Sequence, residues 1–253
     1  MSTATTATPT GREPALLGQT VVVIGGSAGI GLETARRARA EGAGVILTGR
    51  NPEHLARAAD ELDARSSVAF DARDRAALER FFGNLPATID HVMVTAGRPH
   101  YGRIVDMDFA QLRSALDENL LLALEVARHA AGRVRPGGTL LLMGGTGARH
   151  PGVGLVIAST VTAALPALTA GLALELAPIR VNLIAAGFVD TPLSASLLGP
   201  ELEHRREQLR ATLPIGRVVG PADVAALAVH LMTNTALTGA TYDIDGGQQL
   251  VAH

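Results

Sequence analysis

Residues 25–31 form a glycine-rich turn, Gly25-Gly26-Ser27-Ala28-Gly29-Ile30-Gly31, directly after the apolar run 20–24. Gly25 would permit a sharp turn, Gly29 a close approach of the backbone to a pyrophosphate, and Gly31 tight packing of the next helix. A helix that begins near Ile30 would present free N–H groups and positive potential at its N-terminus. The order strand, glycine turn, helix therefore predicts a dinucleotide site, with an ordinary tight loop as the alternative.

Short apolar runs alternate with helical patterns along the rest of the chain. The predicted strands are 20–24, 44–47, 68–70, 91–95, 139–143, 180–184 and 241–244, and the predicted helices are 29–41, 52–64, 74–82, 108–131, 153–177 and 221–232. This alternation favours an α/β fold, a Rossmann-type doubly wound parallel sheet of about seven strands with helices on both faces. The strands are apolar on both sides of the pleat, as a doubly covered sheet requires. We expect one domain over residues 16–253, after a loose N-terminal tail at 1–15.

Composition narrows the possible partners. The 253 residues carry a formal net charge of -2 and no cysteine. This charge gives no reason to expect nucleic acid or an anionic membrane as a partner. The absence of cysteine excludes disulfides, thiolate zinc sites and a cysteine nucleophile, and it fits a reducing cytoplasm, so we expect a cytoplasmic protein. The 8 histidines show no ligand spacing, so no metal site is predicted.

One stretch, 153–174, is long and apolar enough to resemble a membrane-spanning helix. It contains the polar or helix-breaking residues Ser159, Thr160, Thr162, Pro166 and Thr169. A buried interface helix is therefore the better interpretation, and no membrane partner is predicted. Pro166 lacks the N–H that would reach the carbonyl of Thr162, so we expect a kink there.

The end of the second predicted strand bears on the choice of cofactor. It reads Thr48-Gly49-Arg50-Asn51 and contains no acidic residue. A carboxylate at this place binds the ribose of NAD, whereas a guanidinium can bind the 2′-phosphate of NADP. Arg50, with Ser27 as a second contact, therefore favours NADP(H). The alternative is that Arg50 only caps an exposed strand end.

Several motifs follow one another in order along residues 18–250, and together they resemble the short-chain dehydrogenase/reductase family. They are the glycine turn 25–31, Asp71-Ala72, Val94-Thr95-Ala96-Gly97, Asn119, 179–182, 186–192 and Asp245-Gly246-Gly247. Ile24 replaces the usual threonine before the turn, and Val94-Thr95 replace two asparagines. The resemblance implies that Asp71 contacts the adenine and that 186–192 meets the nicotinamide.

The glycine turn, Arg50 and the resemblance together predict an NADP(H) site. Its predicted contacts are Gly25, Ser27, Gly29, Ile30, Gly31, Arg50, Asn51, Asp71, Ala72, Ala96, Gly97, Gly187, Val189 and Thr191.

The catalytic residues of the family do not carry over to this chain. The register of 172–182 puts the family's tyrosine at Ala158, its lysine at Thr162 and its serine at Gly145. Only Asn119 of the usual participants is kept. The chain contains no lysine, and no tyrosine lies within 102–241. Because the tyrosine protonates the carbonyl oxygen in the family, any catalysis here needs another proton route.

Loop residues could supply that proton. Tyr101, with His100 beside it, follows the fourth predicted strand on a loop that borders the cleft in the family, and His150 follows the fifth. Histidine titrates near neutrality and can act as a general acid. A solvated loop residue is the plain alternative for each. The candidate catalytic residues are thus Asn119, His150 and Tyr101.

Two parts of the sequence concern substrate access to the site and self-association of the chain. Residues 193–214 stand where the family carries a substrate-covering flap, and their mixed apolar and charged pattern suits a mobile lid or an ordinary surface helix. The apolar helix 153–177 and the run 120–122 predict pairing of helices between copies of the chain. The resemblance implies a homotetramer or homodimer.

Three functions remain open. The first is an NADP(H)-dependent oxidoreductase that transfers hydride to or from a small activated substrate by a non-standard proton route. The second is a catalytically inactive relative that acts as a cofactor-binding sensor or structural subunit. The third is a non-redox lyase or isomerase that uses His100, Tyr101 or His150. The set of cofactor motifs favours the first.

Overall fold

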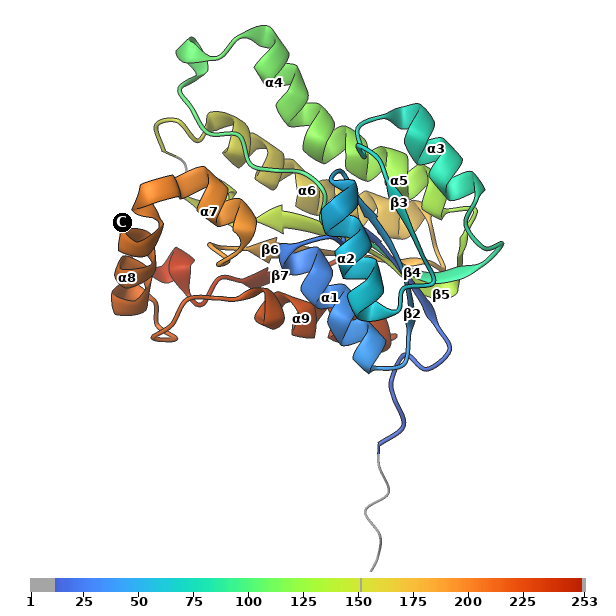
Figure 1. The fold of residues 1–253 in the computed structure, drawn as a ribbon. Coiled ribbons are helices and arrows are strands. Elements are labelled where there is room, and N and C mark those ends of the chain that lie inside the picture. Colours follow the sequence, from blue (N-terminus) through green and yellow to red (C-terminus); the bar gives the residue numbers. More distant parts are fainter. Residues whose placement is uncertain (1–11, 151, 252–253) are drawn as a thin grey trace, which may run out of the picture.

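A seven-stranded parallel sheet forms the centre of the computed structural model, which describes residues 12–150 and 152–251 (Figure 1). The strands are β1 Thr20–Ile24, β2 Gly44–Gly49, β3 Ser66–Ala69, β4 Ile89–Val94, β5 Val134–Gly145, β6 Arg180–Ala186 and β7 Thr241–Ile244. They lie in the order β3-β2-β1-β4-β5-β6-β7. The carboxyl ends of β1 and β4 therefore form the switch point at which such sheets bind ligands. The predicted Rossmann-type fold is confirmed.

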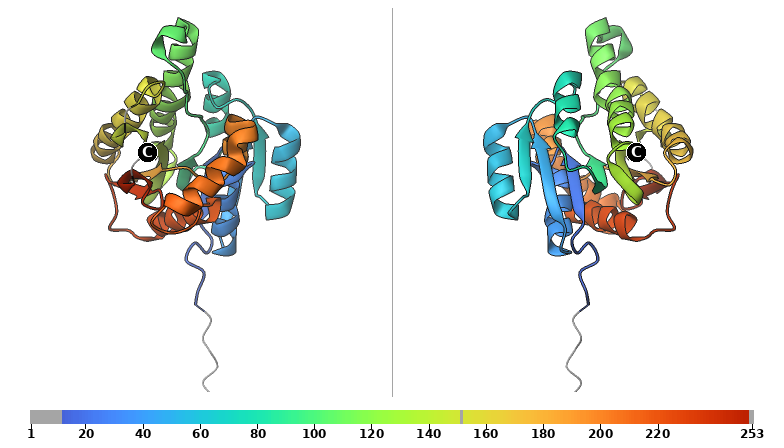
Figure 2. Two further views of the ribbon diagram at one scale, coloured as in Figure 1. Left: turned by 90° about the vertical axis from the view of Figure 1, so that its left-hand side faces the viewer. Right: turned by 90° about the vertical axis from the view of Figure 1, so that its right-hand side faces the viewer.

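Helices cover both faces of this sheet (Figure 2). They are α1 Gly29–Ala40, α2 Pro52–Leu62, α3 Arg75–Gly83, α4 Phe109–Leu116, α5 Leu122–Ala130, α6 Val156–Glu175, α7 Pro192–Leu198, α8 Leu202–Thr212 and α9 Pro221–Thr233. On one face Val22 shares a core with Val126 of α5 and Leu165 of α6. On the other face Val23 shares a core with Ala35 of α1 and Val224 of α9. Successive residues of β1 thus enter opposite cores, as the pleat requires.

The strands at and near the sheet edges differ from the prediction. All four residues of β3 are exposed, so the expectation that every strand is apolar and covered on both faces is wrong here. The reason is that β3 is an edge strand that pairs with β2 alone. Strand β5 begins at Val134 rather than at residue 139, because Val134 pairs with Ile89 across a register shift. Residues 1–11 of the predicted tail lie outside the described residues.

The helix predicted over 108–131 is interrupted. Helices α4 and α5 are joined by a π-helical turn at Asp117–Leu121, which contains Asn119. Such turns are rare and frequent at functional sites, because the extra residue per turn redirects side chains. The helix predicted over 153–177 is α6, which continues as one helix through Pro166.

Helix α6 is, by length and composition, the one helix of the described residues that could cross a membrane. Its Leu165 and Leu172 are buried in the core together with Val181 of β6. Of its apolar stretch 22% is buried, so α6 packs one side on the sheet and leaves much of its apolar surface exposed in the single chain.

A buried histidine in β4 predicts how folding stability depends on pH. His91 is 1% exposed, and its Nδ1 and Nε2 lie 2.8 Å from Thr139 Oγ1 and 2.7 Å from Gln19 Oε1. Burial lowers the pKa of His91 from 6.5 to about 3. Between these two values the unfolded chain binds a proton that the folded protein does not bind. The free energy of unfolding therefore falls as the pH drops through this window.

We expect His91→Gln to remove the pH-dependent part of the free energy of unfolding that comes from His91. This part amounts to about 1.4 kcal/mol per pH unit at most. Urea unfolding across the same pH window measures the slope. His204→Gln, at an exposed position of α8, is the matched control and should keep the wild-type slope. An unchanged slope in His91→Gln would contradict the assignment.

Candidate cofactor and active site

The glycine turn closes tightly over the end of β4. Gly25 has a φ of +97°, which favours glycine. A Cβ on Gly31 would overlap the carbonyl oxygen of Gly25 and lie 2.5 Å from Thr95 Oγ1. Thr95, in place of the family's asparagine, holds the same turn, because its hydroxyl lies 3.1 Å from the Ile24 oxygen and 3.0 Å from the Gly25 oxygen. Only glycine fits these positions.

The first turn of α1 is left open to an anion. The N-cap residue, Ala28, makes no side-chain cap hydrogen bond, and the first turn contains no acidic residue. The N–H groups of a helix that has no cap carry partial positive charge that suits a pyrophosphate. Gly29 and Thr191 face each other across this entrance, since a Cβ on Gly29 would lie 3.5 Å from Thr191. The turn therefore fits the phosphates of a dinucleotide.

The carboxyl end of β2 forms the side of the site predicted to hold the adenosine ribose. A Cβ on Gly49 would lie 2.7 Å from Ser27 Oγ, which shows how closely Ser27 approaches the residue before Arg50. Arg50 is exposed, and no hydrogen bond or ion pair engages its guanidinium within residues 12–150 and 152–251. Asn51 serves as the N-cap of α2, since its Oδ1 accepts from His54 N at 2.9 Å. Ser27 and Arg50 together fit a 2′-phosphate.

The predicted adenine contact, Asp71, is already engaged. Arg73 donates to the Asp71 carboxylate from its backbone N at 3.0 Å and from Nη2 at 2.6 Å. These hydrogen bonds lower the pKa of Asp71 below its usual value. Ala72, beside it, packs against the core. An ionised carboxylate at this place can still accept from an amino group, because each oxygen has more than one lone pair.

Residues 187–191, which follow β6, form the side of the site opposite β2. Gly187 packs against Asp245 and Gln248, and a Cβ there would lie 2.6 Å from Asp245 Cβ. Val189 pairs with Val219 in an isolated bridge, and Thr191 caps α7 by accepting from Ser194 N at 3.2 Å. These contacts give the segment a defined path beside the glycine turn.

A cavity of about 760 Å³ runs from the glycine turn to the end of β5 and the start of α6. Its wall includes the predicted contacts Gly25, Gly29, Ile30, Gly31, Ala96, Gly97, Gly187, Val189 and Thr191, and also Asn119, Tyr101, His150, Gly145, Ala158 and Thr162. Ser27, Arg50, Asn51, Asp71 and Ala72 lie outside this cavity. The predicted cofactor cradle and the positions of the missing catalytic residues thus share one space.

The three positions of the family's catalytic residues carry no acid here. A Cβ on Gly145 would lie 3.4 Å from Thr162 Cγ2, which is ordinary contact. The Thr162 hydroxyl is directed to its own helix, with the Ala158 oxygen at 2.9 Å and the Ser159 oxygen at 3.1 Å. Asn119 donates to the Ala115 oxygen at 2.9 Å from the π-helical turn. None of these groups is a strong proton donor.

The other candidate donors occupy the cavity wall in different ways. Tyr101 is 58% exposed, and the residues that crowd its hydroxyl raise the pKa of that phenol, so it stays protonated at neutral pH. His150 Nε2 lies 2.8 Å from the carbonyl oxygen of Gln249, which ties it to the C-terminal segment. His100 is half-buried, so the alternative expectation that it is a solvated loop residue is wrong. Its Nε2 lies 3.3 Å from Glu118 Oε2.

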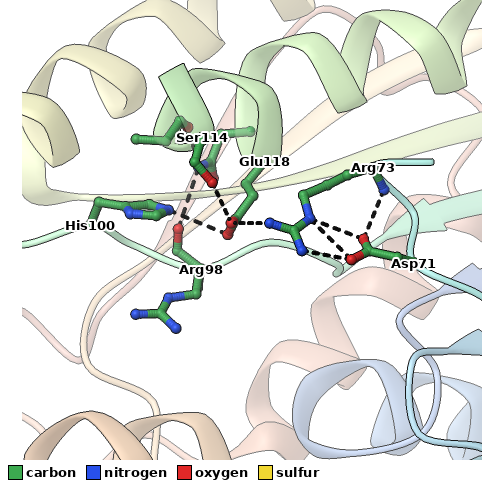
Figure 3. A network of polar contacts seen from close by, with 8 residues as sticks. Asp71, Arg73, Arg98, His100, Ser114 and Glu118 are labelled. Atoms are coloured by element: carbon green, nitrogen blue, oxygen red, sulfur yellow. Dashed lines mark hydrogen bonds and ion pairs between the residues drawn. The ribbon is translucent and has the colours of Figure 1, made fainter. Parts of the chain in front are cut away.

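Two residues that no sequence motif singles out, Arg73 and Glu118, connect Asp71 to His100 (Figure 3). Arg73 Nη1 donates to Glu118 Oε1 at 2.9 Å. Glu118 directly precedes Asn119, and that adjacency was the one available signal. Within residues 12–150 and 152–251, no group of three or more His, Cys, Asp or Glu side chains could hold a metal ion.

The predicted lid, 193–214, consists of α7, a 3-10 turn at Gly199–Glu201 and α8. Leu193, Leu197 and Arg205 of this segment line the cavity. Arg206 of α8 pairs with Asp190 at 2.7 Å and so links the segment to the loop after β6. The segment covers the cavity on one side, and its mobility stays a prediction.

These features define a protein of the Rossmann fold class with a cavity at the switch point of its sheet. Residues 25–249 match the family profile described as Enoyl-(Acyl carrier protein) reductase. The chain belongs to the short-chain dehydrogenase/reductase family, an oxidoreductase family that uses nicotinamide cofactors.

Curated relatives and solved structures agree with this assignment. The chain is 31% identical to 3beta-hydroxysteroid dehydrogenase 1 of Eggerthella lenta, over 93% of this chain and 95% of that protein. It is 30% identical to dehydrogenase/reductase SDR family member 4 of Sus scrofa, over 93% of this chain and 89% of the relative. A small-chain dehydrogenase solved in complex with NADPH superposes with a TM-score of 0.79 at 28% identity, over 92% and 99% of the two chains.

Proposed function

We propose that this protein is an NADP(H)-dependent oxidoreductase that transfers hydride to or from a small activated substrate without the family's tyrosine. The observation that carries the proposal is the single cavity that joins the glycine turn to Gly145, Ala158 and Thr162. The nicotinamide, when bound, supplies or accepts the hydride. The N-terminus of α1 binds the pyrophosphate, and the segment after β6 orients the nicotinamide end.

The loss of the tyrosine sets a limit on the substrate. A positioned general acid contributes roughly 10²–10⁴-fold to rate, or about 3–5 kcal/mol of barrier. Correct alignment of the two reactants can itself contribute several kcal/mol. An electron-poor carbonyl, imine, quinone or alkene needs less help from an acid, so we expect the substrate to belong to these classes.

Preference for NADP(H) follows from Arg50 and Ser27. No acidic residue stands at the end of β2, and the guanidinium of Arg50 forms no ion pair or hydrogen bond among the described residues, while its positive charge adds to the hydrogen bonds from Arg73 that lower the pKa of Asp71. The NADPH complex of a family member supports the same choice. A charge-assisted hydrogen bond to a phosphate is worth about 1.5–3 kcal/mol.

We expect Arg50→Ala to weaken NADPH binding by about tenfold to a hundredfold while NADH binding stays unchanged, because only NADPH carries the 2′-phosphate. Thermal unfolding with NADPH, NADP, NADH or NAD measures this loss of affinity. A ligand at 100 times its Kd adds about 2.7 kcal/mol to the free energy of unfolding. Arg57→Ala, at an exposed position of α2, is the matched control. Equal shifts for NADH and NADPH in the wild type would contradict the role of Arg50.

Oxidation of NADPH against carbonyl, imine, quinone and activated-alkene panels tests the reaction itself. A protein that binds NADPH but oxidises it no faster than buffer would favour the second candidate function, a cofactor-binding sensor or structural subunit. The absence of an acid at Gly145, Ala158 and Thr162 is the observation behind that candidate. Turnover of a substrate without any change in nicotinamide absorbance would instead indicate a lyase or isomerase.

Self-association remains part of the proposal. Apolar side chains of the α5 and α6 region are exposed in the single chain, among them Leu121, Leu124, Val156 and Leu174. Pairing of these helices between copies would bury them in a homodimer or homotetramer. A cytoplasmic location also stays a prediction.

A further inference from the structure

His100 and Glu118 form a polar pair inside the cavity wall (Figure 3). The His100 side chain is 17% exposed, and its Nε2 is fully buried. This nitrogen lies 3.3 Å from Glu118 Oε2, an ion-pair distance, although the angle is not that of a hydrogen bond. Among the described residues, Glu118 is the one carboxylate within ion-pair distance of this nitrogen.

The carboxylate of Glu118 is held in place from its other side. Its Oε1 accepts from Arg73 Nη1 at 2.9 Å and from Ser114 Oγ at 3.1 Å. Arg73 is in turn held by Asp71. These contacts occupy Oε1 and leave Oε2 directed at His100. A buried carboxylate with a compensating arginine can stabilise an imidazolium at this distance by ion pairing.

The second ring nitrogen of His100, Nδ1, is solvent-accessible, on a residue that lines the cavity. Nδ1 makes no hydrogen bond within residues 12–150 and 152–251, yet it is absent from the buried atoms that lack a partner, so it is accessible. His100 lines the same cavity as Ala158 and Thr162. One nitrogen thus lies against a carboxylate, and the other is accessible in a residue of the cavity wall.

We propose that His100, oriented by Glu118, is the general acid–base residue that takes the place of the missing tyrosine. This inference rests on the proposed function. In a reduction, the carbonyl carbon gains a hydride from the reduced nicotinamide, which is oxidised, and the carbonyl oxygen gains the Nδ1 proton of the imidazolium. The C=O π electrons become the new O–H bond, and neutral His100 regains a proton from water. Oxidation runs these transfers in reverse.

The other groups near the cavity are less suited to this role. Tyr101 is more exposed than His100, and a raised pKa makes its phenol a weaker acid. His150 Nε2 lies 2.8 Å from the carbonyl oxygen of Gln249, and this contact occupies that nitrogen. Arg73 and Asp71 act on His100 only through Glu118.

We expect His100→Ala to lower kcat/KM with NADPH and 4-nitrobenzaldehyde by roughly 10²–10⁴-fold, because a positioned general acid contributes that much. Free imidazole should restore part of the rate, since it can enter the space left by the side chain. His230→Ala, at an exposed position of α9, is the matched control, with no loss and no rescue. NADPH-dependent thermal stabilisation should be the same in all three proteins.

Nitrogen-15 NMR of histidine gives a readout that does not depend on turnover. The neutral imidazole of His100 should carry its proton on Nε2, facing Glu118, and Glu118→Gln should weaken that preference. A proton on Nδ1 in the wild type would overturn the inference.

The kinetic outcomes separate the two proposals. If the wild type turns over and His100→Ala matches it, the role of His100 is wrong and the proposed function stands. If the wild type oxidises no NADPH with any substrate class, the proposed function fails and this inference fails with it.

Discussion

The variant G145S/A158Y/T162K in the His100→Ala background is expected to reduce 4-nitrobenzaldehyde with a kcat/KM at least about 100-fold above that of His100→Ala alone. It restores a hydroxyl, a phenol and an ammonium at the three positions of the family's catalytic residues. A positioned general acid contributes roughly 10²–10⁴-fold. Steady-state oxidation of NADPH measures the gain.

The structure leaves room for these side chains. A Cβ on Gly145 meets nothing closer than 3.4 Å, and that nearest atom belongs to Thr162, which the variant also replaces. Ala158 and Thr162 lie four residues apart on α6, so their side chains share one face of the helix. Both line the cavity.

The matched control is G145S/A158F/T162K, which has nearly the same bulk but lacks the phenol hydroxyl. In the same His100→Ala background it should show no gain over His100→Ala alone. A gain of similar size in both variants would mean that shape, rather than proton transfer, limits the rate of His100→Ala.

Gly31→Ala is expected to abolish the stabilisation by NADPH and to lower the free energy of unfolding by about 1–3 kcal/mol, the usual cost of overpacking. The new methyl group would overlap the Gly25 carbonyl oxygen and approach Thr95 Oγ1 to 2.5 Å. Backbone atoms cannot move aside as a flexible side chain can, so the turn itself must open. Urea unfolding and thermal shifts with and without NADPH measure both effects.

Gly171→Ala provides the contrast for Gly31→Ala. Gly171 lies inside α6, and a Cβ there meets nothing within 4 Å. Alanine favours a helix interior by about 1 kcal/mol over glycine, so this variant should keep its response to NADPH and gain stability. If Gly31→Ala binds NADPH as well as Gly171→Ala does, the glycine turn is not the phosphate site.

The fold was predictable because its signals are local. Each strand and helix appears as a short apolar or helical pattern, and the alternation of the two dictates a parallel sheet. The predictions were wrong where the exposure or length of a strand depends on the strands beside it in the sheet. Strand β3 is exposed because it ends the sheet, and β5 is longer because Val134 finds a partner in Ile89. The π-helical turn around Asn119 has no signature in the sequence that we could recognise.

The site was predictable to the extent that it consists of contiguous motifs. The glycine turn, Arg50 and the vacant positions at Gly145, Ala158 and Thr162 can each be identified within a few residues of sequence. The partner of His100 could not be identified in this way. His100 and Glu118 are 18 residues apart, and each is a common polar residue with no pattern around it.

The sequence by itself determined the Rossmann-type sheet, the nucleotide turn and the absence of the Tyr–Lys pair, because these depend on residue type and short-range order. Only the tertiary structure decided that His100 is half-buried in the cavity wall, with Nε2 against Glu118 and Nδ1 accessible. The physical reason is that burial and orientation of a side chain depend on elements distant in the sequence. Here these are the loop after β3, the π-helical turn and the loop after β4.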